Sequence, residues 1–164
     1  MDEIKKIMVA LSFSKHAAGI FNYSEKLAKS LGAELIVVNV VNSRDVQAIA
    51  SIANMGYELD PEKYVKELKE ERKLALEEVV KDSSFSLDDL TLILKVGNPI
   101  DELLKIIVKD NVDMVVMGIK GRTDLENILI GSVAEKLFRR SPVTVVSYRD
   151  EKNMERLKDR IQLT

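Results

Sequence analysis

Five short runs of apolar residues, rich in valine and isoleucine, alternate with longer amphipathic stretches along the 164-residue chain. Continuous apolar runs of this length are typical of strands that are buried on both faces of a sheet. A helix between two such strands forms a βαβ unit, in which the crossover is right-handed and the strands are parallel. The alternation therefore predicts a single doubly wound α/β sandwich. The predicted strands span residues 4–11, 34–41, 90–96, 112–117 and 143–147.

The amphipathic stretches predict helices, and their ends carry ordinary helix signals. Ser14 and Asp60 are candidate N-caps, and Gly32 ends the first helix. The charged run 66–73 is interpreted as the solvated face of a helix. Residues 45–55 form either a helix or an ordered loop. The predicted helices span residues 15–31, 61–81, 100–109 and 132–140.

Residues 149–164 differ from the rest of the chain because they are rich in charges of both signs. Met154, Leu157 and Ile161 lie at helical spacing and form one narrow apolar stripe. This segment is either a helix that docks on the domain or on a partner, or a tail that frays in solvent. We therefore expect an α/β domain over residues 1–148 and a charged C-terminal tail over residues 149–164.

Composition excludes several classes of function. A hydrophobic content of 46% is enough for a substantial core. The net charge of −2 argues against a nucleic-acid binder, and nothing in the sequence indicates a membrane surface. The absence of cysteine excludes disulfides and cysteine nucleophiles, and the single histidine, His16, excludes a metal site built from histidines. Since the chain has neither an 18-residue apolar span nor a cleavable leader, we expect a cytoplasmic protein.

The stretch after the fourth predicted strand brings glycines next to the start of a helix. The strand stops at Gly118, and the next helix begins near Gly131 and Ser132. Exposed N–H groups of such a loop and of a helix N-terminus direct partial positive charge at one place. This arrangement suits a phosphate group. The same glycines could instead serve only for turns and for a helix cap.

The spacing of these glycines is similar to a known signature. Gly118, Gly121, Gly131 and Ser132 follow the pattern G-x2-G-x9-G-S, which resembles the ATP-binding signature of the universal stress protein family. The flanks are similar too, because an apolar strand precedes the first glycine and a Gly-x-Pro turn follows the third strand. The resemblance implies a Rossmann-like fold of the adenine nucleotide alpha hydrolase type with strand order 3-2-1-4-5. Strands one and four then meet at the ligand site.

The resemblance also implies which residues bind the nucleotide. The glycines, Ser132 and Val133 would line the phosphates, and Val40 would meet the adenine. Lys120 and Arg122 would pair with phosphate charge or stay solvated. The implied ligand is ATP, with AMP or ADP as alternatives, and Mg²⁺ or Mn²⁺ held through the phosphates without a protein ligand. The implied nucleotide-binding residues are Ala10, Leu11, Ser12, Val40, Met117, Gly118, Lys120, Gly121, Arg122, Gly131, Ser132 and Val133.

The stretch after the first strand departs from the pattern of the family. ATP-binding members usually carry an aspartate there, in a sequence such as P-x-D-x-S. Here Ala10 stands in place of the proline and Ser12 in place of the aspartate. Ser12 keeps a hydrogen-bonding group but lacks the negative charge. The departure bears on the ribose or metal contact, whereas phosphate anchoring at the glycines does not depend on it.

No catalytic signature accompanies the glycines. The sequence lacks GxxxxGK[ST], GxSxG, HExxH and the kinase motifs. Of the nearest acids, Asp113 lies at the N-terminal end of the fourth strand, and Asp124 is interpreted as a loop surface residue. We expect a regulatory or stress-response protein that binds nucleotide with slow or no hydrolysis. The alternatives are a nucleotide-free interaction module and, with less support, a nucleotide-dependent transferase.

The last predicted strand, residues 143–147, would lie at the edge of the sheet. An apolar edge strand without a neighbour invites pairing with another chain. The resemblance implies the same, because members of the family commonly dimerise through this strand. We therefore expect a homodimer.

Overall fold

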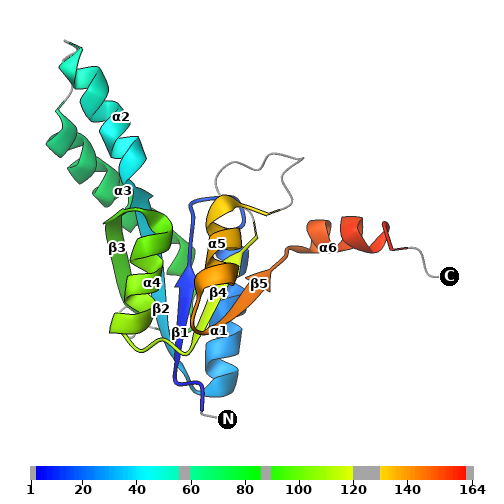
Figure 1. Cartoon of the computed structure of the whole chain (residues 1–164). Coiled ribbons are helices and arrows are strands. Elements are labelled where there is room, and N and C mark those ends of the chain that lie inside the picture. The colour runs from blue at the N-terminus through cyan, green and yellow to red at the C-terminus, as the bar shows by residue number, and fades with distance from the viewer. Residues whose placement is uncertain (1–2, 56–59, 86–89, 120–129, 162–164) are drawn as a thin grey trace.

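The computed structural model describes residues 3–55, 60–85, 90–119 and 130–161, and the prediction of an α/β sandwich is confirmed. Strands and helices alternate along the chain (Figure 1). In order, the elements are β1 (Lys6–Ala10), α1 (Ala17–Leu31), β2 (Glu34–Asn42), α2 (Ser43–Asn54), α3 (Pro61–Val80), β3 (Thr91–Gly97), α4 (Pro99–Lys109), β4 (Met114–Gly118), α5 (Ser132–Arg140), β5 (Thr144–Tyr148) and α6 (Glu151–Lys158).

The five strands form one parallel sheet in the order β3-β2-β1-β4-β5, as the resemblance implied. The order reverses between β1 and β4, so the chain leaves these neighbouring strands toward opposite faces. Ala10 at the end of β1 lies opposite Val38 of β2 and Met117 of β4. Such a reversal leaves a crevice beyond the carboxyl ends of the strands, where ligands of doubly wound sheets bind.

Two apolar cores cover the two faces of the sheet. On one face, α1 and α3 pack on the strands through buried residues such as Phe21 and Leu76. On the other face, α4 and α5 do so through Ile107 and Leu137. The neighbouring strands β1 and β4 are covered on both faces, which explains why their sequences are continuous apolar runs.

Most helices begin at a side-chain cap. The side chains of Asn42, Asp60, Asn98 and Asp150 accept hydrogen bonds from backbone N–H groups of the first turns of α2, α3, α4 and α6. The prediction of Ser14 as the N-cap of the first helix is wrong, because α1 begins two residues later than expected, after His16. The backbone turns at Ser14 instead, where its carbonyl accepts from the N–H of Ala17 at 3.0 Å.

The stretch between β2 and β3 contains two helices. For residues 45–55 the sequence allowed either a helix or an ordered loop, and in the structure these residues lie almost entirely in α2. None of the residues of α2 is buried, and Figure 1 shows α2 and the first half of α3 extending beyond the sheet. Their position places both helices beside the carboxyl ends of the strands.

The residues after β5 form the helix α6 rather than a frayed tail. No residue of α6 is buried, and Met154 is 40% exposed, so its apolar stripe does not join either core. Among the residues that the structure describes, no helix is both long enough and apolar enough to cross a bilayer.

Candidate functional site

A cavity of about 370 Å³ lies at the carboxyl ends of the strands, where the strand order reverses. Its volume is within the range of about 300–1,000 Å³ that is common for small-molecule sites. It is lined by the ends of β1, β2 and β4, by the start of α5 and by residues of α2, α3 and α4. The segments that follow β1, β2 and β4 are far apart in the sequence, and they meet at this cavity, as expected from the topology.

The two ends of the glycine motif lie side by side on one wall of this cavity. Gly118 ends β4, and Gly131 precedes α5. The N–H of Gly131 donates to the carbonyl of Ile119 at 2.8 Å, which holds the ends together although residues 120–130 lie between them. Both glycines line the cavity. The geometry thus gives the cavity a wall of backbone rather than of bulky side chains.

The N-terminus of α5 opens on the same wall without a side-chain cap. Gly131 occupies the N-cap position, so no side chain of that residue can accept from the first turn. The first N–H groups of a helix have no partner within the helix, and the helix dipole adds partial positive charge there. Ser132 and Val133 line the cavity at this point. This end of the cavity is therefore suited to an anion.

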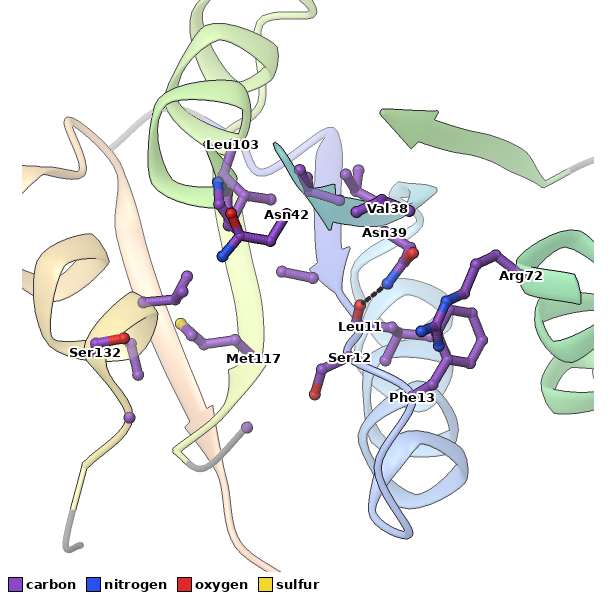
Figure 2. A pocket seen from close by; sticks show the side chains of 18 of the residues that line it. Leu11, Ser12, Phe13, Val38, Asn39, Asn42, Arg72, Leu103, Met117 and Ser132 are labelled. Carbon is purple, nitrogen blue, oxygen red and sulfur yellow. Dashed lines mark hydrogen bonds between the residues drawn. The ribbon is translucent and has the colours of Figure 1, made fainter. Parts of the chain in front are cut away.

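The structure brings together most of the residues that the sequence predicted for the site. Lys120, Gly121 and Arg122 lie outside the described residues. The other nine predicted residues all line the one cavity, namely Ala10, Leu11, Ser12, Val40, Met117, Gly118, Gly131, Ser132 and Val133. Figure 2 shows Met117 and Ser132 on one side of the cavity and Leu11 and Ser12 on the other.

The wall opposite the glycines is mainly apolar. It includes Val38 and Val40 of β2 and Leu103 of α4. Ser12 is half-buried there, and Asp45 of α2 is the acid among the described residues that line the cavity. A flat apolar ring fits such a wall. The end of β2 continues past Val38, its last residue paired with β1, so backbone groups on that side of β2 can form hydrogen bonds with a ligand.

Arg72 of α3 lines the cavity, although the sequence assigned it to a solvated face. That interpretation is wrong for Arg72, which is only 8% exposed. Its guanidinium lies over the ring of Phe13, 4.5 Å from the ring centroid, as Figure 2 shows. A charged residue within the run 66–73 carries no local sign that it turns inward. Only the position of α3 beside the loop after β1 makes Arg72 part of the site.

Asn39 was likewise not predicted as a site residue, because in the sequence it is one polar residue within an apolar strand. Its Nδ2 donates to the carbonyl of Leu11 at 2.8 Å, which ties β2 to the segment after β1. This bond fixes the orientation of the amide, and its buried Oδ1 has no hydrogen-bond partner among the described residues. Asn39 thus holds Leu11 and Ser12 against the end of the sheet.

The remaining polar candidates lie elsewhere. Asp113 accepts from the N–H groups of Lys5 and Lys6, both at 2.9 Å, at the opposite end of the sheet, as predicted. The Nδ1 of His16 lies 2.7 Å from a carboxylate oxygen of Asp150, away from this cavity. In the described part of the chain, no three of the His, Asp and Glu residues group as ligands for a metal ion. The cavity offers binding groups, and we identify no nucleophile with an adjacent base.

Comparison with known proteins gives one family. The model of the universal stress protein family matches residues 3–149. The chain is 31% identical to universal stress protein MJ0577 of Methanocaldococcus jannaschii over 157 residues, which cover 87% of this chain and 94% of that protein. It is 36% identical to universal stress protein MJ0531 of the same organism, over 84% of this chain and 75% of the other.

Solved structures agree with the fold. A structure of MJ0577 superimposes with a TM-score of 0.75 at 26% identity and covers 92% of this chain and 99% of that one. A universal stress protein from Archaeoglobus fulgidus, in complex with dAMP, gives a TM-score of 0.59 at 18% identity. That likeness covers 90% of this chain and all of the other.

Proposed function

This chain belongs to the universal stress protein family, and on that basis we propose that it binds an adenine nucleotide, with ATP as the preferred ligand, in a stress response. The observation that carries the proposal is the single cavity in which both ends of the glycine motif meet the end of β2. The universal stress protein from Archaeoglobus fulgidus in complex with dAMP gives independent support for an adenine nucleotide.

In this proposal the phosphates lie against the glycine wall, which is the side of the cavity formed by Gly118 and Gly131. Among the described residues no side chain caps α5, so the N–H groups of its first turn can donate to phosphate oxygens. The hydroxyl of Ser132 adds a donor from the same turn. Gly118 and Gly131 allow close approach, since a side chain at either position would project into the space that the phosphates need. Lys120, Gly121 and Arg122 lie outside the described residues, and their contact with the phosphates stays a prediction from the sequence.

The adenine lies against the apolar wall. Val40 offers both its side chain and the backbone of β2, and Met117 and Leu11, both buried, complete an apolar surface for the ring. Backbone N–H and C=O groups of β2 then read the edge of the base. Ser12 lines the side of the cavity opposite Met117 and Ser132, where its hydroxyl can donate to or accept from the ribose.

A divalent cation fits this site only as a companion of the phosphates. In the described part of the chain no cluster of ligand residues is present, so Mg²⁺ or Mn²⁺ would be held mainly by phosphate oxygens and water. Hydrolysis also needs a residue that positions the attacking water. Asp45 of α2 lines the cavity and is exposed, and no histidine is among the described residues that line it. We therefore propose binding with slow or no hydrolysis.

The ligand carried by the purified protein tests this proposal. The protein is denatured directly after purification, and the released small molecules are identified by mass. Adenine nucleotide is the expected product, and steady-state hydrolysis of added ATP should be far below the about 1–10³ per second of ordinary enzymes. Release of a ligand of another class, or turnover within that range, would overturn the proposal.

A further inference from the structure

A second cavity, of about 220 Å³, lies on the other side of the end of β4. It is formed where α6 leaves the edge strand β5 and passes the start of α1. Gly118 and Ile119 also line the first cavity, called the nucleotide cavity from here on. The other described residues of the second cavity do not line the first. The proposed nucleotide function makes no use of this cavity.

The floor of the second cavity is firmly built. Tyr148, the last residue of β5, packs so closely on α1 that a Cβ at Gly19 would lie 2.8 Å from its hydroxyl. The ring of Tyr148 also lies 5.6 Å from the ring of Tyr23, centroid to centroid. Gly19 therefore permits a contact that holds an aromatic ring beneath the cavity, and this contact fixes the start of the segment that leads to α6.

On one wall of the second cavity, a side-chain contact joins His16, which precedes α1, to Asp150, which precedes α6. Nδ1 of His16 lies 2.7 Å from Oδ2 of Asp150, and Asp150 also caps α6 by accepting from the N–H of Asn153 at 2.8 Å. Burial acts to raise the pKa of Asp150, but the hydrogen bonds from Asn153 and the charges of His16 and Lys15 hold it below its usual range. The carboxylate is thus ionised, and it contacts both His16 and the first turn of α6.

The chemistry of the lining is that of an amphiphilic anion site. Among the described residues that line the cavity, Arg149 and Arg156 are positively charged and Asp150 is the acid. Ile20 and Leu157 line it together with the ring of Tyr148 described above, so its body is apolar. Guanidinium groups bind carboxylates and phosphates through two parallel hydrogen bonds.

We propose that the second cavity binds a small organic anion, consisting of one ring or short apolar body with a single phosphate or carboxylate group. The apolar body lies on the floor of the cavity and the anionic group meets Arg149 and Arg156. The volume is below the about 300 Å³ at which sites for larger ligands commonly begin, which favours a ligand smaller than a complete nucleotide. The site is separate from nucleotide binding and does not depend on it.

Phenyl phosphate is the probe that tests this site, and benzyl alcohol is the matched probe without charge. Each is titrated into ¹⁵N-labelled full-length protein, and the backbone amides of Tyr148 and Asn153 report on the second cavity. Phenyl phosphate is expected to give saturable shifts at both amides, whereas benzyl alcohol gives shifts that are much weaker. The same shifts are expected in Gly131→Leu, which obstructs the nucleotide cavity, so failure of one site is distinguishable from failure of the other.

Two variants in the same tail separate the site from a general attraction of anions. Arg156→Gln removes a lining guanidinium and is expected to weaken phenyl phosphate binding about three- to tenfold. Arg160→Gln removes an exposed arginine outside the lining and should leave binding unchanged. Shifts confined to Ser132 and Val133, equal binding by both variants, or no saturable shift because a second copy of the chain covers the cavity would each overturn the proposal.

Discussion

At the scale of single residues, the least predictable member of the site is Arg72. Its neighbours in the sequence are charged and solvated, and arginine is rarely buried without a partner. In the structure its guanidinium stacks on Phe13, a residue that follows β1. The burial depends on how α3 crosses the end of the sheet, which is a tertiary property. Residues such as Gly131 could be predicted because their requirement is local, whereas Arg72 and Asn39 could not.

Replacing Arg72 by methionine tests how much this stacking contributes. Arg72→Met keeps much of the side-chain length but removes the charge over Phe13, so the free energy of unfolding should fall by about 1–2 kcal/mol. Arg139→Met is the control, because Arg139 is exposed and its side chain lies 3.5 Å from that of Glu135 in an exposed ion pair. It should change stability by less than about 0.5 kcal/mol. Urea unfolding measures both, and equal losses would contradict the assigned role.

Glu25 of α1 illustrates how one carboxylate joins two elements. It accepts from the hydroxyls of Ser83 and Ser84 and from the N–H of Ser84, at 2.6–2.8 Å, and so ties α1 to the segment after α3. Burial would raise the pKa of Glu25, but these hydrogen bonds and the charge of Lys29 together lower it. Because the pKa is lower in the folded state, this contribution is present above the ordinary pKa of a glutamate and is lost as the pH falls through the lowered value.

Glu25→Gln should therefore destabilise the protein in a pH-dependent way. At pH 7 we expect a loss of about 1–2 kcal/mol, since glutamine keeps the shape but not the charge. Below about pH 4 the difference from the unsubstituted protein should shrink, because the glutamate takes up a proton first in the unfolded state and, as the pH falls through the lowered pKa, in the folded state. Glu67→Gln, at an exposed position, should show no such trend. Urea unfolding at several pH values measures the difference, and a constant difference from pH 7 to pH 3 would contradict this account.

At the scale of elements, the predictions that held were those that rest on local periodicity. All five strands and the four predicted helices are present, and their ends differ from expectation by a few residues. The start of α1 differed because a backbone turn at Ser14 replaces a side-chain cap. The segment 45–55 carries apolar residues at helical spacing, but none of the residues of α2 is buried, so no core packing accompanies this helix. The helical state of α6 depends on its cap Asp150 rather than on packing.

The edge strand β5 leads to a prediction about assembly. In the described structure it pairs with β4 on one side only, and Val145 and Val146 are half-buried at this edge. Such an edge favours pairing with a second copy. Sedimentation equilibrium at micromolar concentration should give about twice the 18.5 kDa of one chain.

Charges introduced at this edge should weaken the dimer. The double substitution Thr144→Lys and Ser147→Lys places lysines on β5, where like charges from two copies would repel each other. The variant should sediment closer to one chain than the unsubstituted protein does, with the same far-ultraviolet circular dichroism. A single 18.5 kDa species for the unsubstituted protein would refute pairing through β5.

At the scale of the whole molecule, the site is a product of topology. The reversal of strand order between β1 and β4 places the segment after β1 opposite the start of α5. The end of β2 forms the third side of the same crevice. No single segment contains the whole site. One sequence motif was enough to predict the wall formed by Gly118 and Gly131, whereas the contribution of α2 and α3 could be identified only from the fold. A ligand that spans the crevice stabilises all of these elements together.

The central claim is that the glycine wall binds the phosphates of an adenine nucleotide, and calorimetric titration of magnesium ATP into nucleotide-free protein tests it most directly. We predict saturable binding to one site per chain that is lost in Gly131→Leu, because a leucine at the start of α5 fills the phosphate end of the cavity. Gly32→Asn, at the end of α1 where φ is 65° and asparagine is tolerated, should bind ATP unchanged. Absence of binding at millimolar ATP, or equal binding by Gly131→Leu, would contradict the claim.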